Sequence, residues 1–261
     1  MKNAGAFILA LVLIACAAAH QNNAQTATEG SAASLMDRAR VLAAQGRNEE
    51  ALAAADAAVA AEPQDFGLPV GRGEVLEQLG RRAEAEESYR AGLRVFEMWL
   101  ETSTAEEAAH YLRYHTLVLT RLGRTPQAIA LVDAELRRSG RQGRLFALRC
   151  EIRVEANVEI DRGLADCNEA LAIEPGSEAA LVARGLAFLR KERWVDAERD
   201  FTALLTFSPA NPDGLYGRGL ARQRLHNALG AARDIAAARQ ALFYIDAEFE
   251  RRGLRQRPRM P

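Results

Sequence analysis

Apolar and polar positions follow a helical spacing along most of the chain, and the helices that this spacing predicts come in pairs. The segment 178–211 shows the pairing most clearly. Leu181 and Leu204 lie equally far from its predicted turn, and so do Phe188 and Ala197. Residues at equal distances from a short turn lie at the same level of two antiparallel helices. The segment therefore predicts a helical hairpin, and a small residue such as Ala197 lets its two helices approach.

The hairpin pattern recurs along the chain with a period of 34 residues. The run Gly46–Ala51 is repeated as Gly80–Ala85, 34 residues later, and Gly123–Ala128 is a third copy. Pro175 and Pro209 are again 34 residues apart. A single hairpin cannot bury its apolar face, so neighbouring hairpins must stack to form a continuous core. The repeats therefore predict an all-α solenoid.

The period and the residues at fixed positions within it resemble the tetratricopeptide repeat (TPR) family. In 178–211, the family's large, small, aromatic, small, aromatic and proline positions are held by Leu181, Gly185, Phe188, Ala197, Phe201 and Pro209. The turn glycine is replaced by Val158 in the fourth copy and by His226 in the sixth, and no copy has the family's tryptophan in its first helix. The resemblance implies a right-handed superhelical solenoid of about six hairpins plus a C-terminal capping helix.

We place this solenoid at residues 34–245, after a flexible linker at 20–33. Its repeats are expected near 32–65, 66–99, 109–142, 144–177, 178–211 and 212–245, with an insertion around 97–108. In the insertion, Thr104 precedes Glu107 at capping-box spacing, which predicts a helix that starts near Ala105. The helices on either side of the insertion are expected to be longer than usual.

The C-terminal residues 246–261 are expected to form a capping helix and a basic tail. Ile245 and Phe249 share one face of that helix, and we interpret the helix as a cover for the last repeat. The tail from Arg251 to Pro261 carries five arginines. We interpret it as a solvated terminus, and contact with acidic lipid or polymer is the alternative.

The N-terminal residues 1–19 are typical of an export signal. The apolar run from Ala6 to Ala15 is shorter than the roughly 20 residues that a membrane-spanning helix needs. The tripeptide before Cys16 resembles the bacterial lipobox, which implies cleavage before Cys16 and its lipidation. The alternative is an ordinary signal-peptidase site with cleavage before His20. In either case we expect the protein in the periplasm, and in the first case it would be lipid-anchored to the outer membrane.

Charge and motif content argue against nucleic-acid binding and against catalysis. The 34 Lys and Arg residues balance 35 Asp and Glu residues, which is not typical of a protein that coats nucleic acid or an anionic membrane. No HExxH, GxSxG, Walker or dinucleotide-binding pattern occurs. His110 and His115 are five residues apart and diverge on a helix, so they cannot share a metal ion. We therefore predict no enzymatic activity, no cofactor and no metal site.

Two cysteines lie in the fourth repeat. Cys150 and Cys167 are equally far from the turn, so they should face each other across the hairpin. An exported protein meets an oxidising compartment, and a disulfide is possible if the Cα atoms lie within about 7 Å. A pair of buried, reduced thiols is the other interpretation. A thiol, redox or enzyme-associated role for the same pair is an alternative function.

The TPR resemblance implies a binding groove, because the first helix of each hairpin lines the concave wall in that family. The residues expected there combine an apolar floor with Tyr and Arg at its edges, which suits an extended or helical peptide. The predicted groove residues are Arg113, Tyr114, Leu117, Arg121, Leu148, Ile152, Val182, Leu186, Leu189, Tyr216, Leu220 and Gln223. The alternative is that neighbouring repeats, the lengthened helices or the C-terminal segment cover the same side chains.

The sequence thus favours a non-catalytic scaffold or adaptor of the bacterial cell envelope. Its expected partner is a protein or peptide that binds in the concave groove, and no nucleic acid is expected. A structural homo-oligomer, in which the terminal segment of a neighbouring copy fills the groove, is the remaining alternative. Contact with a membrane is expected only through the lipid on Cys16.

Overall fold

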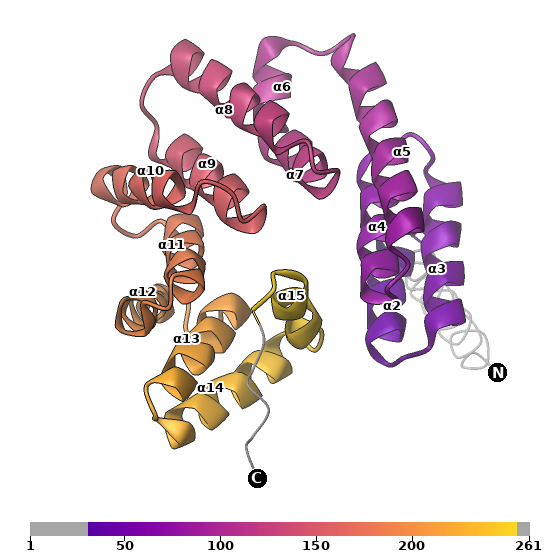
Figure 1. Ribbon diagram of the computed structural model, residues 1–261. Helices are drawn as coiled ribbons and strands as arrows, with labels where there is room; N and C mark the ends of the chain where they lie inside the picture. The colour runs from indigo at the N-terminus through magenta and orange to yellow at the C-terminus, as the bar shows by residue number, and fades with distance from the viewer. Residues whose placement is uncertain (1–30, 255–261) are drawn as a thin grey trace, which may run out of the picture. The chain divides into compact units, whose positions relative to one another are not determined.

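Helices make up all the regular secondary structure that the structure describes. The computed structural model describes residues 31–254, and these residues hold fourteen helices and no strand (Figure 1). The apolar half of the sequence is mostly Ala and Leu, which are strong helix formers. The prediction of an all-α fold is confirmed.

Most of the helices follow one another as pairs joined by short turns, a first helix and then a second. The pairs are α2 (Ala32–Ala44) and α3 (Asn48–Ala61), α4 (Gly67–Gln78) and α5 (Arg82–Leu100), α7 (Leu112–Arg121) and α8 (Thr125–Ser139), α9 (Gly143–Glu155) and α10 (Ile160–Ile173), α11 (Glu178–Arg190) and α12 (Trp194–Phe207), and α13 (Pro212–Arg224) and α14 (Ala228–Ala241). Two short helices, α6 (Ala105–His110) and α15 (Ile245–Arg251), lie outside these pairs.

The chain divides into two compact units, and the boundary falls within α5 after Val95. Unit one contains α2, α3, α4 and the first part of α5, and its core is built largely from alanines. Ala39, Ala51 and Ala58 are fully buried there. Unit two contains the end of α5 and α6 to α15, and it holds the cavities described below.

The insertion begins with a capped helix, as its spacing predicts. The Thr104 side chain accepts a hydrogen bond from the Glu107 backbone N–H, and the Glu107 carboxylate accepts one from the Thr104 backbone N–H. Helix α6 therefore starts at Ala105. The expected lengthening holds for α5, which has 19 residues, but not for α7, which has 10. Helix α7 is short because the chain is interrupted at Tyr111, between α6 and α7.

A residue with positive φ lies two positions after the end of the first helix in every pair. The first three pairs use Gly46, Gly80 and Gly123, with φ between +71 and +75°, and the last three use Asn157, Glu192 and His226, with φ between +54 and +61°. The interpretation of Val158 as the turn residue is wrong. Asn157 takes that position because the extra residue of this repeat follows the turn, before α10 begins at Ile160. Asn tolerates the left-handed region better than a β-branched residue does.

Phe201 of α12 fixes how closely two successive first helices approach each other. The ring is fully buried and lies against the backbone of Gly185 in α11 and of Gly217 in α13. A Cβ atom at these glycines would lie 2.7 Å and 2.3 Å, respectively, from Phe201 Cζ, which is closer than carbon atoms approach. Glycine at both positions is therefore required for the ring to sit between α11 and α13.

Buried ion pairs join the two helices of three successive hairpins. An arginine of the first helix donates two hydrogen bonds to an aspartate of the second, at 2.6–3.0 Å. The aspartates are only 3–5% exposed. The pairs are Arg149–Asp166, Arg184–Asp200 and Arg218–Asp234.

We predict that Gly217→Ala destabilises unit two, because the new methyl group would overlap the Phe201 ring. Overpacking of this kind costs about 1–3 kcal/mol. The matched control is Gly176→Ala, whose Cβ would have its nearest neighbour at 4.0 Å, in ordinary contact. Urea denaturation followed by circular dichroism measures both variants. Equal midpoints for Gly217→Ala, Gly176→Ala and the wild type would contradict the assigned role of this glycine.

Candidate binding groove

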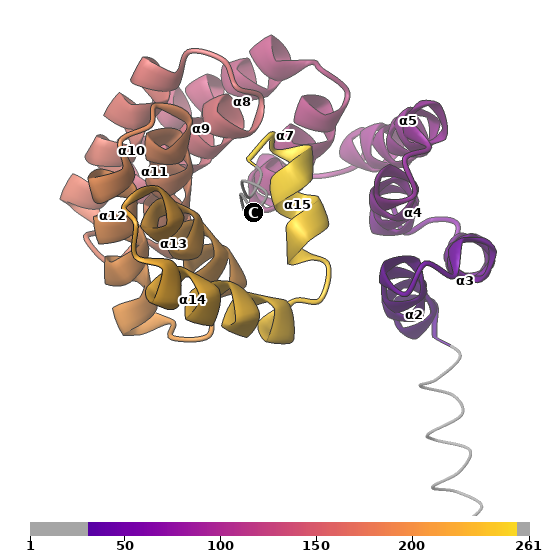
Figure 2. The same cartoon turned by 60° about the horizontal axis from the view of Figure 1, so that its bottom comes forward.

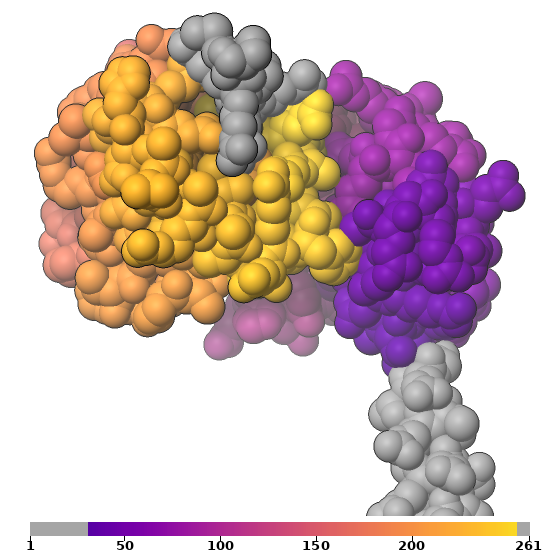
Figure 3. Space-filling view, turned by 90° about the horizontal axis from the view of Figure 1, so that it is seen from below, coloured from indigo at the N-terminus to yellow at the C-terminus, as the bar shows by residue number. Residues whose placement is uncertain are grey.

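The first helices of unit two share a surface that faces α15. We call this surface, formed by α7, α9, α11 and α13, the inner wall. Figure 2 shows α15 inside the arc formed by α7 to α14, and Figure 3 shows α14 and α15 side by side on one face of unit two. Contacts from α15 to α9 and to α13, described next, place it against the inner wall.

The apolar face of α15 covers part of the inner wall. Ile245 and Phe249 are fully buried, and the Phe249 ring centroid lies 4.4 Å from that of Tyr216 in α13. The Tyr216 hydroxyl donates a hydrogen bond of 2.6 Å to Asp246 Oδ1. Burial, and then the carboxylate of Asp246, raise the pKa of Tyr216. Arg239 of α14 donates two further hydrogen bonds to Asp246, at 2.7 and 2.8 Å.

The C-terminal end of α15 is held by charged contacts. Arg251 lies 3.1 Å from Glu155 of α9, and Arg252 lies 2.9 Å from the same carboxylate. Arg252 also pairs with Asp213 of α13. Burial alone would raise the pKa of Glu155, but Arg252 and Arg251 outweigh it and hold that pKa below its ordinary value. The carboxylate is therefore ionised at neutral pH.

One cavity of about 340 Å³ lies on the inner wall beside Arg252, and we call it the acidic cavity. Its apolar floor includes Val182 and Leu186 of α11. Its charged lining consists of four carboxylates and two guanidinium groups, from Glu151, Glu155, Glu178, Asp213, Arg113 and Arg252. Arg113 donates hydrogen bonds of 2.7 and 2.8 Å to the two oxygens of Glu151. Burial raises the pKa of Glu151 despite that contact.

A second cavity of about 290 Å³ lies on the other side of the α15 terminus, and we call it the arginine cavity. Leu189, Trp194, Leu220 and Leu254 form its apolar lining, and its charged lining residues are Arg190, Glu192 and Arg224. The Arg224 guanidinium lies 5.0 Å from the centroid of the Trp194 ring. Within residues 31–254, neither Arg190 nor Arg224 has an ion-pair or hydrogen-bond partner. Burial lowers the pKa of Arg190.

The predicted groove residues are distributed over these features. Arg113, Val182 and Leu186 line the acidic cavity, and Leu189 and Leu220 line the arginine cavity. Tyr216 lies under α15, so the C-terminal segment covers at least this part of the wall. The other six line neither cavity: Leu148 and Ile152 are buried, whereas Tyr114, Leu117, Arg121 and Gln223 are half-buried.

The residues predicted for the groove did not include the acidic side chains of the wall. The spacing of two of these residues nevertheless indicates that they lie on the wall. Glu151 and Glu155 follow Leu148 by three and seven residues, which places all three on one helical face. Leu148 was itself a predicted groove residue. Arg190 and Arg224 occupy the same repeat position as Glu155 in the two following first helices.

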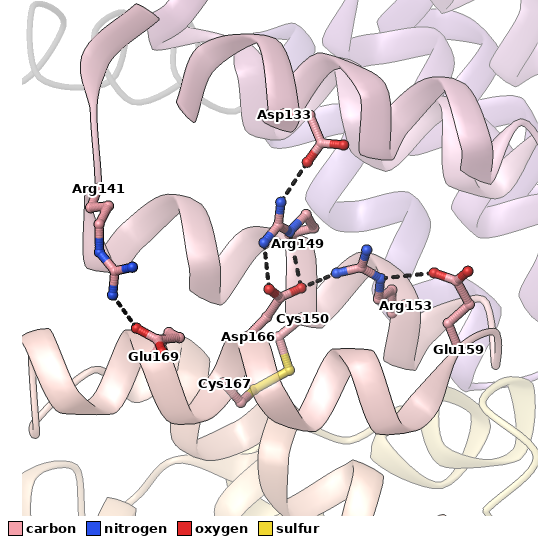
Figure 4. A network of polar contacts seen from close by, with 9 residues as sticks. All are labelled: Asp133, Arg141, Arg149, Cys150, Arg153, Glu159, Asp166, Cys167 and Glu169. Atoms are coloured by element: carbon pink, nitrogen blue, oxygen red, sulfur yellow. Dashed lines mark hydrogen bonds and ion pairs between the residues drawn. A yellow bond between two sulfur atoms is a disulfide. The ribbon is translucent and has the colours of Figure 1, made fainter. Parts of the chain in front are cut away.

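Helix α9, which carries Glu151 and Glu155, is fixed to its neighbours by covalent and ionic contacts (Figure 4). Cys150 and Cys167 form a disulfide between α9 and α10, with their Cα atoms 5.4 Å apart. Arg149 lies 2.5 Å from Asp133 of α8 and also binds Asp166 of α10. The wall is therefore anchored close to its acidic residues.

Other kinds of site find no support in the part of the chain that the structure describes. Residues 31–254 contain no cluster of three His, Cys, Asp or Glu side chains arranged to hold a metal ion. Within the same residues, no helix combines the length and the apolar character that a membrane span requires.

The decisive comparison is with protein families. The model of the tetratricopeptide repeat family matches residues 36–97 and 70–143. This match supports the TPR family for residues 36–143. The match spans the last helix of unit one and reaches α9, so it includes the first of the inner-wall helices. Proteins with TPR repeats bind protein or peptide partners. Among curated proteins, no relative matches the chain.

Solved TPR structures share the fold at low sequence identity. TTC0263, a thermophilic TPR protein of Thermus thermophilus, aligns with a TM-score of 0.50 and 17% identity over 72% of this chain and 98% of its own. The type IV pilus biogenesis factor PilW gives 0.44 and 18%, over 81% and 93%. YrrB, a TPR protein with an unusual peptide-binding site, gives 0.38 and 15%, over 89% and 97%. The predicted TPR solenoid fold is confirmed.

We predict that reduction of the Cys150–Cys167 disulfide destabilises the hairpin of α9 and α10. The bond closes a loop of 17 residues, and constraint of the unfolded chain by such a loop contributes about 3 kcal/mol. Urea denaturation with and without dithiothreitol measures the effect. The control is the double variant Cys150→Ala/Cys167→Ala, which should not respond to reductant. A wild-type midpoint that is the same in both conditions would show that the bond is absent or without effect.

Proposed function

We propose that this protein is a non-catalytic scaffold that binds a segment of a partner protein on the inner wall of unit two. The observation that carries the proposal is the acidic cavity. It joins an apolar floor to four carboxylates on a wall formed by stacked repeats, and TPR repeats bind protein or peptide partners. A side chain that is apolar along its stem and basic at its tip, such as Lys or Arg, complements both parts of this cavity.

The rigidity of the wall supports recognition over catalysis. The disulfide and the Arg149 contacts hold α9 against α8 and α10, so the cavity is preformed. A preformed site loses less conformational entropy when it binds a peptide than a flexible one does. A redox role for the two cysteines is less favoured, since both sulfur atoms are used in a buried bond.

Peptide selection on the full chain tests the proposal. A displayed library of random 12-residue peptides is selected on the wild type, and the enriched peptides are then assayed by fluorescence anisotropy. We expect enrichment of peptides in which Lys or Arg lies near apolar residues. Val182→Glu places a charge on the floor of the cavity and should weaken their binding at least tenfold, which is about 1.4 kcal/mol.

The matched control is Val195→Glu on α12, where the valine is 60% exposed and lines neither cavity. It should bind the selected peptides as the wild type does. The proposal fails if no peptide is enriched, or if Val182→Glu and Val195→Glu bind the selected peptides equally well.

We further propose that the scaffold acts in the bacterial cell envelope, with Cys16 as its lipid-anchored N-terminus. Cys16 and the rest of the export signal lie outside the described residues, so the proposal is supported by the apolar run and the lipobox-like tripeptide of the sequence. The disulfide agrees with an oxidising compartment.

Metabolic labelling with a palmitate analogue tests the anchor in bacteria that express the full chain. We expect the wild type to incorporate the label and to fractionate with membranes, because the acyl chains partition into lipid. Cys16→Ser should lose both properties, whereas Cys150→Ser, as a control, should keep them. An unlabelled wild type that is processed before His20 would contradict the lipid anchor and leave a protein without one.

A further inference from the structure

Helix α15 depends on the inner wall for its own structure. It has seven residues, and an isolated helix of that length is not stable in water. Only Ile245 and Phe249 bury apolar side chains completely, and its other contacts are hydrogen bonds and ion pairs. Two buried side chains that join the core of the repeats, together with polar contacts, therefore hold it as they would hold a short bound peptide.

The charges at the end of α15 fit the wall imperfectly. Arg251 and Arg252 share Glu155, which also attracts Arg190, while the charges of Arg251 and Arg252 oppose that of Arg190. The Nε atoms of Arg190 and Arg251 are buried and have no hydrogen-bond partner within the described residues. A buried donor without a partner is unfavourable, because it has lost its hydrogen bonds to water. The end of α15 is thus a weak point of the contact.

The same end of α15 separates two cavities that it does not fill. Arg252 lines the acidic cavity, and Gly253 and Leu254 line the arginine cavity. Leu186 lies in the first cavity and Leu189 in the second, so the two open on successive parts of α11. A longer segment in place of α15 would contact the wall that these cavities leave uncovered.

We propose that α15 occupies the site on the inner wall where a partner binds. The partner is an amphipathic helix that carries the contact residues of α15 and one additional carboxylate. Such a helix presents an aromatic residue and, three positions later, a basic residue, as Phe249 and Arg252 do. Its carboxylate follows at the position of Leu254 and pairs with Arg190. This inference rests on the proposed function and names the class of partner.

Charge complementarity favours such a partner over a second copy of this chain. The α15 of another copy would bring the same Arg251 and Arg252 to Glu155 and would leave Arg190 without a hydrogen-bonded carboxylate. Glu155, which attracts Arg190, is already bound by Arg251 and Arg252. A helix with a carboxylate near Arg190 supplies a further counter-charge in a partly buried site, where an ion pair is stronger than in water. The partner therefore gains contacts that α15 lacks.

The competition between α15 and a partner has a measurable consequence. A tethered segment acts at an effective concentration in the millimolar range. The apparent affinity for an added ligand equals its intrinsic affinity multiplied by the fraction of molecules in which the site is free. Variants that release α15 should therefore bind an added helix more tightly, although the wall itself is unchanged.

The test uses a fluorescein-labelled peptide of residues 242–254, added to the full chain and followed by anisotropy. Phe249→Ala removes the buried ring of α15, and we expect this variant to bind the peptide at least tenfold more tightly than the wild type does. Arg252→Glu is a second route to release that leaves the apolar core intact, and it should act in the same direction. Circular dichroism checks that both variants keep their helices.

Two matched controls accompany these variants. Phe243→Ala removes a phenyl ring that is 46% exposed just before α15, and Arg233→Glu reverses an exposed charge on α14. Both should bind the peptide as the wild type does. A second peptide that carries Leu254→Glu should bind Phe249→Ala more tightly than the native peptide does, because it provides the carboxylate for Arg190.

Three results would overturn the inference. Equal binding by the wild type and both release variants, or no binding by any of them, would make α15 a fixed cap. A wild-type dimer in light scattering that Phe249→Ala dissolves would make a second copy the occupant. A Leu254→Glu peptide that binds no more tightly than the native one would remove the carboxylate from the proposed partner. Library peptides whose binding is weakened by Val182→Glu would still support binding at the acidic cavity. Failure of the inference about α15 is therefore distinguishable from failure of the proposed function.

Discussion

The contact of one phenyl ring with two glycines governs the stacking of the repeats on which the inner wall depends. Phe201 projects from a second helix and lies between Gly185 and Gly217 of two successive first helices. The ring fills the space where their backbones would otherwise leave a void, and any Cβ at either glycine would push the helices apart. The spacing of α11 and α13, and hence the width of the wall between Val182 and Tyr216, follows from this contact.

The arginine–aspartate pairs fix how the first helices are aligned along the second helices. Arg184 binds Asp200 within its own hairpin and also donates to Asn168 of the preceding second helix, as Arg149 does to Asp133. A buried ion pair contributes little net stability, because its desolvation offsets the attraction. It penalises a misplaced helix heavily, however, since a shift would leave a buried charge unpaired. The apolar contacts thus supply the stability, and the arginines of α9 and α11 align these helices with two second helices each.

The sequence predicted the hairpins well because their determinants are local. The period of 34 residues, the small residue at Gly185 and the aromatic at Phe201 all act within one repeat or between neighbours. The turn at Val158 was misassigned because an insertion of one residue shifts the alignment without changing the apolar pattern. The disulfide was left open because hairpin symmetry places Cys150 opposite Cys167 but does not fix the distance between two packed helices.

The groove was harder to predict because it depends on contacts between distant repeats. Arg251 meets Glu155 across 96 residues of sequence, and only the curvature of the stack brings them together. Sequence periodicity shows that Ile245 and Phe249 share a face, but it cannot show which wall that face covers. The acidic residues were overlooked for a similar reason, since a carboxylate on a concave surface has the same local pattern as one on an outer surface.

Some arginines of unit two bind a carboxylate and others do not. This difference separates the part of the unit that maintains the fold from the part that is available to a partner. Where the first helices pack on the second helices, the arginines have carboxylates within the array, as Arg184 and Arg218 do. Along the inner wall, Arg121, Arg190 and Arg224 recur at one repeat position, and none of them has a carboxylate within hydrogen-bond distance among the described residues. Glu155 holds that position in α9, and the arginines of α15 bind there. Because an unpaired, partly buried charge is costly to the fold itself, its recurrence along one wall is better explained by a ligand than by stability.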